Sequence, residues 1–187
     1  MSRLVRHCKR LYFSYFSQPS SDRLVYRLLR KQRIRKILEL GIGTGVRAQR
    51  MLQLATGDQY PPSISYTGVD LFESRSETDG PGLSLKLAHR QLKIGGARVR
   101  LVPGDPYSAL ARIANELGAI DLMLISADQD RQSLAKAWFY VPRIMHAETL
   151  VLLEDRPATE DVMKLSRVPR LQIEQWAAQT TPRRAAA

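Results

Sequence analysis

Residues 37–45 read Ile-Leu-Glu-Leu-Gly-Ile-Gly-Thr-Gly, a short apolar run followed by glycine at every second position. The first four residues suit a buried parallel strand, and residues 46–54 predict a helix that begins as soon as the glycines stop. Glycine has no Cβ, so the backbone can turn sharply there and approach a ligand closely. This stretch therefore predicts a strand, a turn and a helix, with a ligand lying against the turn.

Four more segments rich in Val, Ile and Leu follow at intervals that suit alternating strands and helices. The predicted strands are 64–70, 98–102, 120–126 and 149–154, and the predicted helices are 20–32, 82–93, 107–117 and 131–145. Pro142 predicts a kink or break in the last helix. We also predict a helix over 158–166 and a sixth strand over 171–176. The alternation predicts an α/β fold with a doubly wound, mostly parallel sheet, abbreviated at its C-terminal edge.

The glycine turn departs from two nucleotide-binding motifs. The dinucleotide motif needs a third glycine where this chain has Val46, and no Gly-Lys-Ser or Gly-Lys-Thr of a P-loop follows. The Glu-Leu-Gly-x-Gly-x-Gly pattern instead resembles motif I of class I S-adenosylmethionine (SAM)-dependent methyltransferases, which are Rossmann-like. That resemblance places Glu39, Gly41, Gly43 and Gly45 under the methionine part of SAM. A purely structural turn is the alternative interpretation.

The next two strands end in residues that fit the same resemblance. Asp70 closes the second strand, where a carboxylate can accept two hydrogen bonds from a ribose diol; the alternative is an aspartate that caps the next turn. Gly104 and Asp105 close the third strand and resemble the pair that lines the adenine pocket in this family. Gly-Asp is also an ordinary turn sequence. We predict that all three residues bind the cofactor.

The fourth and fifth strand ends, residues 125–129 and 152–156, partly resemble those of small-molecule O-methyltransferases. In metal-dependent relatives these segments hold magnesium through acidic and amide oxygens. Here Ser126 replaces the first carboxylate and Arg156 replaces the amide, which leaves only Asp155 of that ligand set. A fixed guanidinium repels a divalent cation, so we predict no metal site.

The sequence does not assign a catalytic base. Gln129 stands where those relatives have histidine, and the remaining candidates are Asp128 and Asp155. A loop carboxylate is more often solvated or caps a helix. Methyl transfer from a sulfonium depends mainly on alignment of the reacting groups, so a missing base does not exclude it.

The charge of the chain is concentrated in its first quarter. The net charge is +11, and residues 1–50 hold 13 lysines and arginines against two acids, so the rest of the chain is balanced. Residues 1–18 contain four basic side chains, Arg3, Arg6, Lys9 and Arg10, followed closely by the aromatic side chains of Tyr12, Phe13, Tyr15 and Phe16. Through residues 1–36 this pattern favours an anionic partner, either nucleic acid or a membrane surface. The alternative is a solvated helix face.

The composition limits the domain organisation. With 187 residues, of which 44% are hydrophobic, the chain suits one domain. We predict a basic aromatic segment over 1–18, a SAM-binding domain over 19–178 and a flexible tail over 179–187. A single cysteine and the absence of any apolar run of about 20 residues predict a cytoplasmic protein without a transmembrane segment.

The resemblance thus predicts a SAM-dependent methyltransferase (EC 2.1.1) that works without metal. A small-molecule oxygen acceptor is favoured by the fourth and fifth strand ends, and a nucleic-acid acceptor by the basic N-terminus. The alternative is a noncatalytic domain of the same fold that binds an anionic partner.

Overall fold

The computed structural model describes residues 3–55, 64–94, 96–156 and 163–180. Within them, six strands form one sheet in the order β3-β2-β1-β4-β5-β6. The first five strands run parallel and β6 is antiparallel to β5. The strands are β1 (Lys36–Leu40), β2 (Ile64–Asp70), β3 (Ala97–Pro103), β4 (Ile120–Ile125), β5 (Met145–Asp155) and β6 (Lys164–Arg167).

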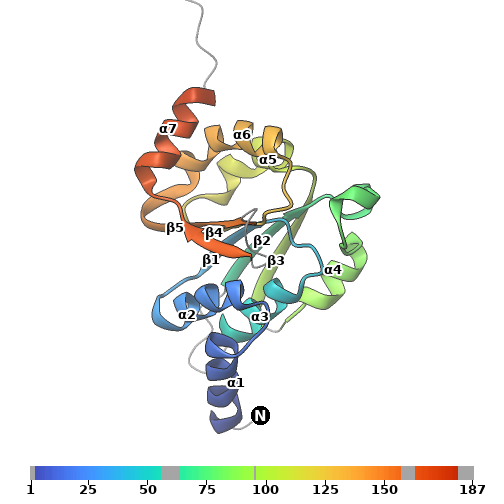
Figure 1. The fold of residues 1–187 in the computed structure, drawn as a ribbon, viewed down its shortest axis with the longest axis vertical. Helices are drawn as coiled ribbons and strands as arrows, with labels where there is room; N and C mark the ends of the chain where they lie inside the picture. Colours follow the sequence, from blue (N-terminus) through green and yellow to red (C-terminus); the bar gives the residue numbers. More distant parts are fainter. Residues whose placement is uncertain (1–2, 56–63, 95, 157–162, 181–187) are drawn as a thin grey trace, which may run out of the picture.

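Helices cover both faces of this sheet (Figure 1). One face carries α2 (Arg23–Lys31), α3 (Val46–Ala55) and α4 (Leu85–Leu92), and α1 (Arg3–Tyr15) extends beyond α2. The other face carries α5 (Pro106–Leu117), α6 (Arg131–Ala137) and α7 (Arg170–Thr180). Short 3-10 turns complete the described chain: η1 (Ser20–Asp22), η2 (Phe72–Ser74), η3 (Glu77–Asp79) and η4 (Trp138–Ile144). The predicted doubly wound fold is confirmed.

The buried apolar residues of the strands divide between two cores because side chains alternate across a strand. In β1, Ile37 packs under α2 and α3, whereas Leu38 and Leu40 pack under the helices of the other face. All three are at most 1% exposed. Strands buried on both sides read as continuous apolar runs, which is why the sequence locates β1 so sharply.

The ends of the helices follow their local sequence. Helix α5 begins with Asp105 as N-cap and Pro106 at its first position, and it ends before Gly118, whose φ is +58°. The predicted helix over 131–145 becomes 3-10 at Trp138, ahead of Pro142, as the proline indicates. The predicted helix over 82–93 begins later, at Leu85, because Ser84 caps it.

The C-terminal region differs from the prediction. Residues 171–176 are not a strand but part of α7, and the sixth strand is instead β6, which overlaps the last three residues of the predicted helix over 158–166. Residues 158–162 of that helix lie outside the described chain. The spacing explains the error. Ile173 and Ala177 are buried four residues apart, the period of a helix, while Leu171 is 67% exposed.

The predicted domain limits remain predictions. Helix α1 lies within the predicted segment 1–18 and packs on α2, with the ring centroids of Phe13 and Tyr26 5.8 Å apart. Helix α7 continues through Thr180, so two residues of the predicted tail are helical. Among the described helices, none combines the length and apolarity needed to cross a bilayer.

The position of α7 predicts that two similar substitutions lower the free energy of unfolding by different amounts. Ile173→Ala removes a fully buried side chain and should lower the free energy of unfolding by about 2–5 kcal/mol. Leu171→Ala, two residues away and exposed, should change it by less than about 0.5 kcal/mol. Urea unfolding of both variants measures the difference. Equal losses would instead indicate a strand, in which the two residues share one face.

Candidate functional site

The glycine turn lies where strand order reverses, because β1 has β2 on one side and β4 on the other. Open α/β sheets bind ligands beyond the carboxyl ends of strands at such a point. Gly41, Gly43 and Gly45 have φ values of +87°, +56° and +73°, a region that side chains disfavour. A Cβ on Gly41 would also lie 2.4 Å from Nε2 of Gln129. The turn therefore requires its glycines.

Asp70 lies beside the turn, at the end of the neighbouring strand β2. Its Oδ2 accepts hydrogen bonds from the backbone amides of Ile42 and Gly43, both at 2.8 Å. Its Oδ1 accepts from the amide of Phe72 at 3.2 Å, a residue with a φ of +50°. The carboxylate thus fixes both the glycine turn and the loop that follows β2.

Arg75 covers the same carboxylate. Its Nε and Nη2 donate to Oδ1 and Oδ2 of Asp70 at 2.7 and 2.9 Å, a two-pronged contact of the strong kind. Nη2 also lies 3.2 Å from Oδ2 of Asp128, and the guanidinium side chain is only 9% exposed. Burial alone would raise the pKa of Asp70, but the hydrogen bonds from Arg75, Gly43 and Phe72 lower it overall.

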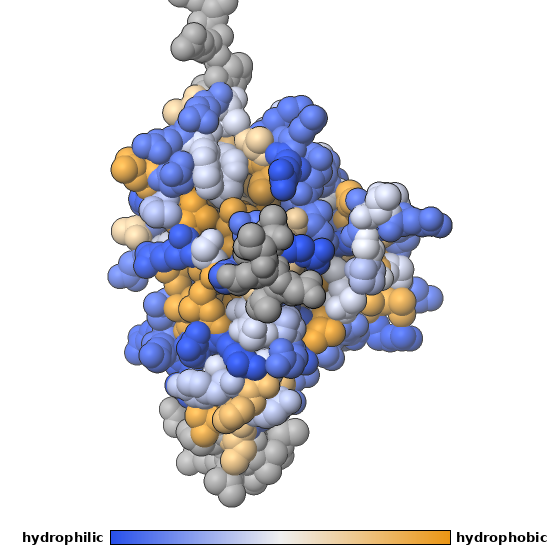
Figure 2. All heavy atoms as spheres, viewed as in Figure 1, coloured by the Kyte–Doolittle hydropathy of each residue, from blue (hydrophilic) through white to orange (hydrophobic). Residues whose placement is uncertain are grey.

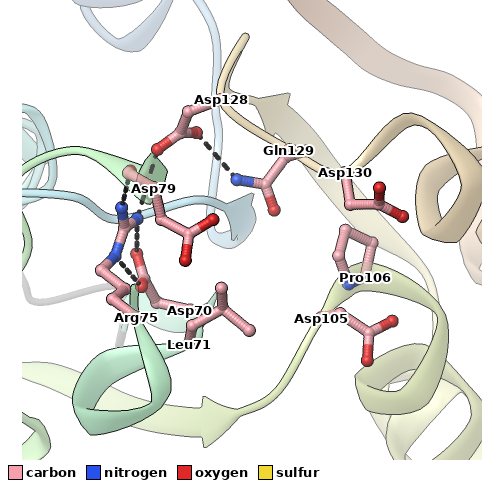
Figure 3. A pocket seen from close by; sticks show the side chains of 9 residues that line it. All are labelled: Asp70, Leu71, Arg75, Asp79, Asp105, Pro106, Asp128, Gln129 and Asp130. Carbon is pink, nitrogen blue, oxygen red and sulfur yellow. Dashed lines mark hydrogen bonds and ion pairs between the residues drawn. The ribbon is translucent and has the colours of Figure 1, made fainter. Parts of the chain in front are cut away.

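These side chains lie together at one side of the crevice between the strand ends (Figure 3). The remaining cavity measures about 40 Å³, whereas sites for small ligands usually measure about 300–1,000 Å³. Its lining is Asp70, Leu71, Arg75, Asp79, Asp105, Pro106, Asp128, Gln129 and Asp130. A ligand of nucleoside size fits the crevice only after Arg75 and its neighbours have moved.

Asp105 lines the crevice, but its carboxylate is turned toward α5 and away from Asp70 (Figure 3). Oδ1 accepts from the amides of Tyr107 and Ser108 at the start of α5, and the hydroxyls of Ser108 and Ser133 donate to the same carboxylate. Gly104 donates its amide to the carbonyl of Asp70 at 2.9 Å. Both residues thus lie near the turn, and their cofactor contacts remain predictions.

Glu39 lies inside the protein, beneath the glycine turn. It is fully buried, accepts from Nε of Arg47 at 2.8 Å and accepts from the hydroxyl of Tyr66. Arg47 also lies 3.5 Å from Asp22 and 3.3 Å from Glu154. Burial raises the pKa of Glu39, an effect that Arg47 and Tyr66 oppose. A direct contact of Glu39 with a ligand stays a prediction.

The two candidate catalytic residues lie apart in the structure. Asp128 lines the crevice beside Arg75, with its side chain 36% exposed. Asp155 is exposed at the end of β5 and does not line the crevice. Ser126 donates its hydroxyl to Glu154 at 3.2 Å. No group of three or more His, Cys, Asp or Glu side chains that could hold a metal occurs within the described ranges.

The sequence did not indicate two arginines that organise this region. Arg75 lies in a polar loop, five residues after Asp70, and only the spatial return of that loop brings the two together. Arg47 follows the glycines within α3 and looks like one of many basic residues on a helix. A signal existed for Arg47, since the buried Glu39 of an apolar strand needs a cationic or hydrogen-bonding partner.

Structural comparison identifies chains of the same architecture. An O-methyltransferase from Bacillus cereus in complex with SAH aligns with a TM-score of 0.56 at 13% identity, over 96% of this chain and 78% of that one. A TehB-like SAM-dependent methyltransferase from Corynebacterium glutamicum gives 0.51 at 14% identity, over 95% and 80%. The chain has the fold of class I SAM-dependent methyltransferases.

A further structural match covers a smaller part of both chains. A precorrin-6y C5,15-methyltransferase from Geobacter metallireducens aligns with a TM-score of 0.50 at 16% identity, over 73% of this chain. This chain spans 62% of that structure's length, less than two thirds. The sequence itself matches no family model and no curated protein. At these identities the likeness establishes the fold.

The capping role of Asp105 predicts a pH dependence. Burial alone would raise its pKa, but hydrogen bonds from Ser108 and Ser133 lower it to about 2 from the ordinary 3.8. Its stabilising effect is therefore complete above pH 4 and is lost as the pH falls through 2. Asp105→Ala should cost about 1 kcal/mol at pH 7, and this difference should shrink between pH 4 and pH 2.

Thermal unfolding of both proteins across that pH range tests this expectation. Asp105→Asn serves as the control, because asparagine also caps helices but does not titrate. A difference between wild type and Asp105→Ala that stays constant down to pH 2 would contradict the proposed role.

Proposed function

We propose that this chain is a SAM-dependent methyltransferase that binds SAM against the glycine turn. The observation that carries the proposal is the turn itself, with three left-handed glycines at the switch point and Asp70 hydrogen-bonded to two of its amides. The Bacillus cereus enzyme of the same fold was solved with SAH, the product that SAM leaves after methyl transfer. SAM supplies a methyl group already activated on a sulfonium.

The residues present fit this cofactor once the crevice opens. Gly43 has open space on its ligand side, since a Cβ there would meet only the carbonyl oxygen of Pro81, at 3.7 Å. Asp70 would hold the ribose, Gly104 and Asp105 would lie at the adenine, and Gly41 and Gly45 would let the methionine part approach the main chain. Glu39 would act on it indirectly, by supporting the turn.

Opening requires Arg75 to release Asp70. The oxygens that would bind the ribose diol are those that Arg75 occupies, so protein and ligand compete for the same acceptors. Asp128 is the second carboxylate that Arg75 contacts. Release of Arg75 would therefore also free Oδ2 of Asp128, whose Oδ1 accepts from Nε2 of Gln129 at 2.8 Å. We propose Asp128 as the group that accepts a proton from the acceptor or orients it; Asp155 remains the other candidate.

We infer a small-molecule oxygen acceptor and a reaction without metal. Ser126 and Glu154 are bonded to each other, and Glu154 also pairs with Arg47. At the end of β5, Arg156 follows Asp155 directly. The carboxylates near the two strand ends are thus engaged by protein partners or lie next to a fixed positive charge, which disfavours a divalent cation.

The competition between Arg75 and the cofactor predicts opposite effects of two substitutions. Asp70→Asn keeps the side-chain volume and one acceptor oxygen but loses the charge, and it should weaken SAH binding by about tenfold or more. Arg75→Ala removes the competitor and should tighten binding by up to about tenfold, because the open state becomes more populated. Titration calorimetry with SAH measures both affinities.

Arg100→Ala is the matched control, because Arg100 of β3 forms an exposed ion pair with Glu116 of α5, away from the crevice. It should leave SAH affinity unchanged. No heat of binding with wild type and with Arg75→Ala alike would reject the cofactor site and favour a noncatalytic domain.

Methyl transfer can be tested directly with SAM labelled in the methyl group. A set of small hydroxylated aromatic compounds, with single-stranded RNA in parallel, serves as acceptors. We expect label in a small-molecule product, at a rate that EDTA does not change. A rate that EDTA abolishes and magnesium restores would contradict the metal-independent reaction, and label in RNA alone would contradict the choice of acceptor.

A further inference from the structure

Helix α1 and the residue that follows it present three of their four aromatic side chains to solvent. Tyr12, Tyr15 and Phe16 are 55%, 44% and 68% exposed, and Cys8, one turn before Tyr12, is exposed as well. We call these four residues the outer face of α1. A surface helix normally turns its apolar residues toward the core, so this arrangement is reversed. Contiguous exposed apolar surface indicates an interaction site.

The orientation of α1 is fixed by contacts on its inner side. Arg10 donates to the carbonyl of Leu54 in α3 at 3.3 Å, and Ser14 and Ser17 are buried with their hydroxyls bonded to carbonyls one turn earlier. Phe13 is the apolar residue on this side, 8% exposed and packed on Tyr26. The inner side thus combines polar residues with Phe13, whereas Tyr12, Tyr15 and Phe16 face outward.

Arg30 of α2 lies beside the outer face of α1, and two more exposed basic residues flank it on the same helix. Arg30 lies over the ring of Tyr15, 5.3 Å from its centroid, and donates to its hydroxyl at 2.9 Å. Arg27, one turn earlier, and Lys31 are exposed on the same helix. At the α1 end of the molecule, Figure 2 shows apolar surface next to strongly hydrophilic surface. Aromatic and cationic groups thus share one end of the protein.

We propose that the outer face of α1 docks on an anionic lipid bilayer. Phe16 and the ring of Tyr12 would enter the boundary between headgroups and acyl chains, and Arg27, Arg30 and Lys31 would contact the anionic headgroups. Helices that lie in a membrane interface combine these two kinds of residue. This role is independent of methyl transfer, because the outer face of α1 and the crevice share no residue.

The ring contacts disfavour single-stranded nucleic acid as the partner. Bases bind to proteins of that kind by stacking on open aromatic faces. Here the rings of Tyr12 and Phe16 stack on each other, with centroids 6.5 Å apart and planes 22° apart, and Arg30 covers a face of Tyr15. The three rings are thus already engaged within the protein, and the apolar surface that they leave exposed suits lipid.

The charge disfavours a second copy of the chain. Residues 1–50 carry the whole net charge of +11. A symmetric dimer through the outer face of α1 would bring two such regions together, and like charges repel each other. An anionic surface instead attracts each Lys or Arg near it, by about fivefold in affinity per residue.

Cosedimentation of the full chain with vesicles tests the proposal. We expect binding to vesicles of phosphatidylcholine and phosphatidylserine in a 7:3 ratio, and little binding to phosphatidylcholine alone. Tyr12→Ser/Phe16→Ser should weaken binding by about tenfold or more, because it removes the inserted apolar surface. Arg27→Gln/Lys31→Gln should weaken it by about twentyfold at low salt.

Leu171→Ser is the matched control, because Leu171 is equally exposed but lies on α7; it should bind as wild type does. Since the substituted residues are exposed, circular dichroism and melting temperature should not change. Failure of wild type to bind the anionic vesicles, or full binding by Tyr12→Ser/Phe16→Ser, would overturn the proposal. Two other results would also overturn it. One is binding of single-stranded RNA by wild type that Tyr12→Ser/Phe16→Ser abolishes and Leu171→Ser does not, and the other is a dimer in sedimentation velocity with the same dependence.

A dye on Cys8 can distinguish insertion into the bilayer from adsorption by charge alone. Cys8 is the chain's single cysteine, so an environment-sensitive dye can be attached at this position alone. Insertion predicts a blue shift of the dye on anionic vesicles and protection from iodide quenching. A dye that remains fully quenchable on bound protein would show adsorption by charge only and would overturn insertion.

Discussion

The candidate site depends on the carboxylate of Asp70, which joins two loops that neither strand could order alone. It holds the amides of the glycine turn after β1, and on the other side it holds the amide of Phe72 and the guanidinium of Arg75. Phe72 adopts a backbone conformation that residues with a Cβ disfavour, and the hydrogen bond to Asp70 offsets part of that cost. The order of the site and its capacity to bind a ligand thus rely on the same oxygens.

A second buried charge connects this region to the N-terminal helices. Arg47 contacts Glu39 of β1, Glu154 of β5 and Asp22 of η1. A guanidinium buried at 11% exposure is tolerated only where carboxylates compensate it. Burial alone would lower the pKa of Arg47, but these carboxylates raise it, so its charge persists. The cluster fixes α3, the strand ends and the entry to α2 relative to one another.

Sequence reasoning succeeded where a residue's neighbours in the chain determine its structure. Apolar runs located β1, β2 and β4, and the glycine pattern located a turn that cannot accept side chains. It failed where distant residues decide. Arg75 matters because its loop returns to Asp70, and Arg47 matters because three separate elements place carboxylates around it. For α7, the same apolar residues suited a strand, and only packing on η4 shows the helical period.

The contact between α7 and η4 has a further use that follows from composition. The chain contains two tryptophans, and both lie in this contact, with the centroids of Trp138 and Trp176 4.7 Å apart. They belong to the core on the face of the sheet opposite α1. Tryptophan fluorescence, excited at wavelengths that tyrosine does not absorb, therefore reports the docking of α7 on η4. It senses neither the glycine turn nor the N-terminal helix directly, so it reports the packing of α7 separately from events at those two places.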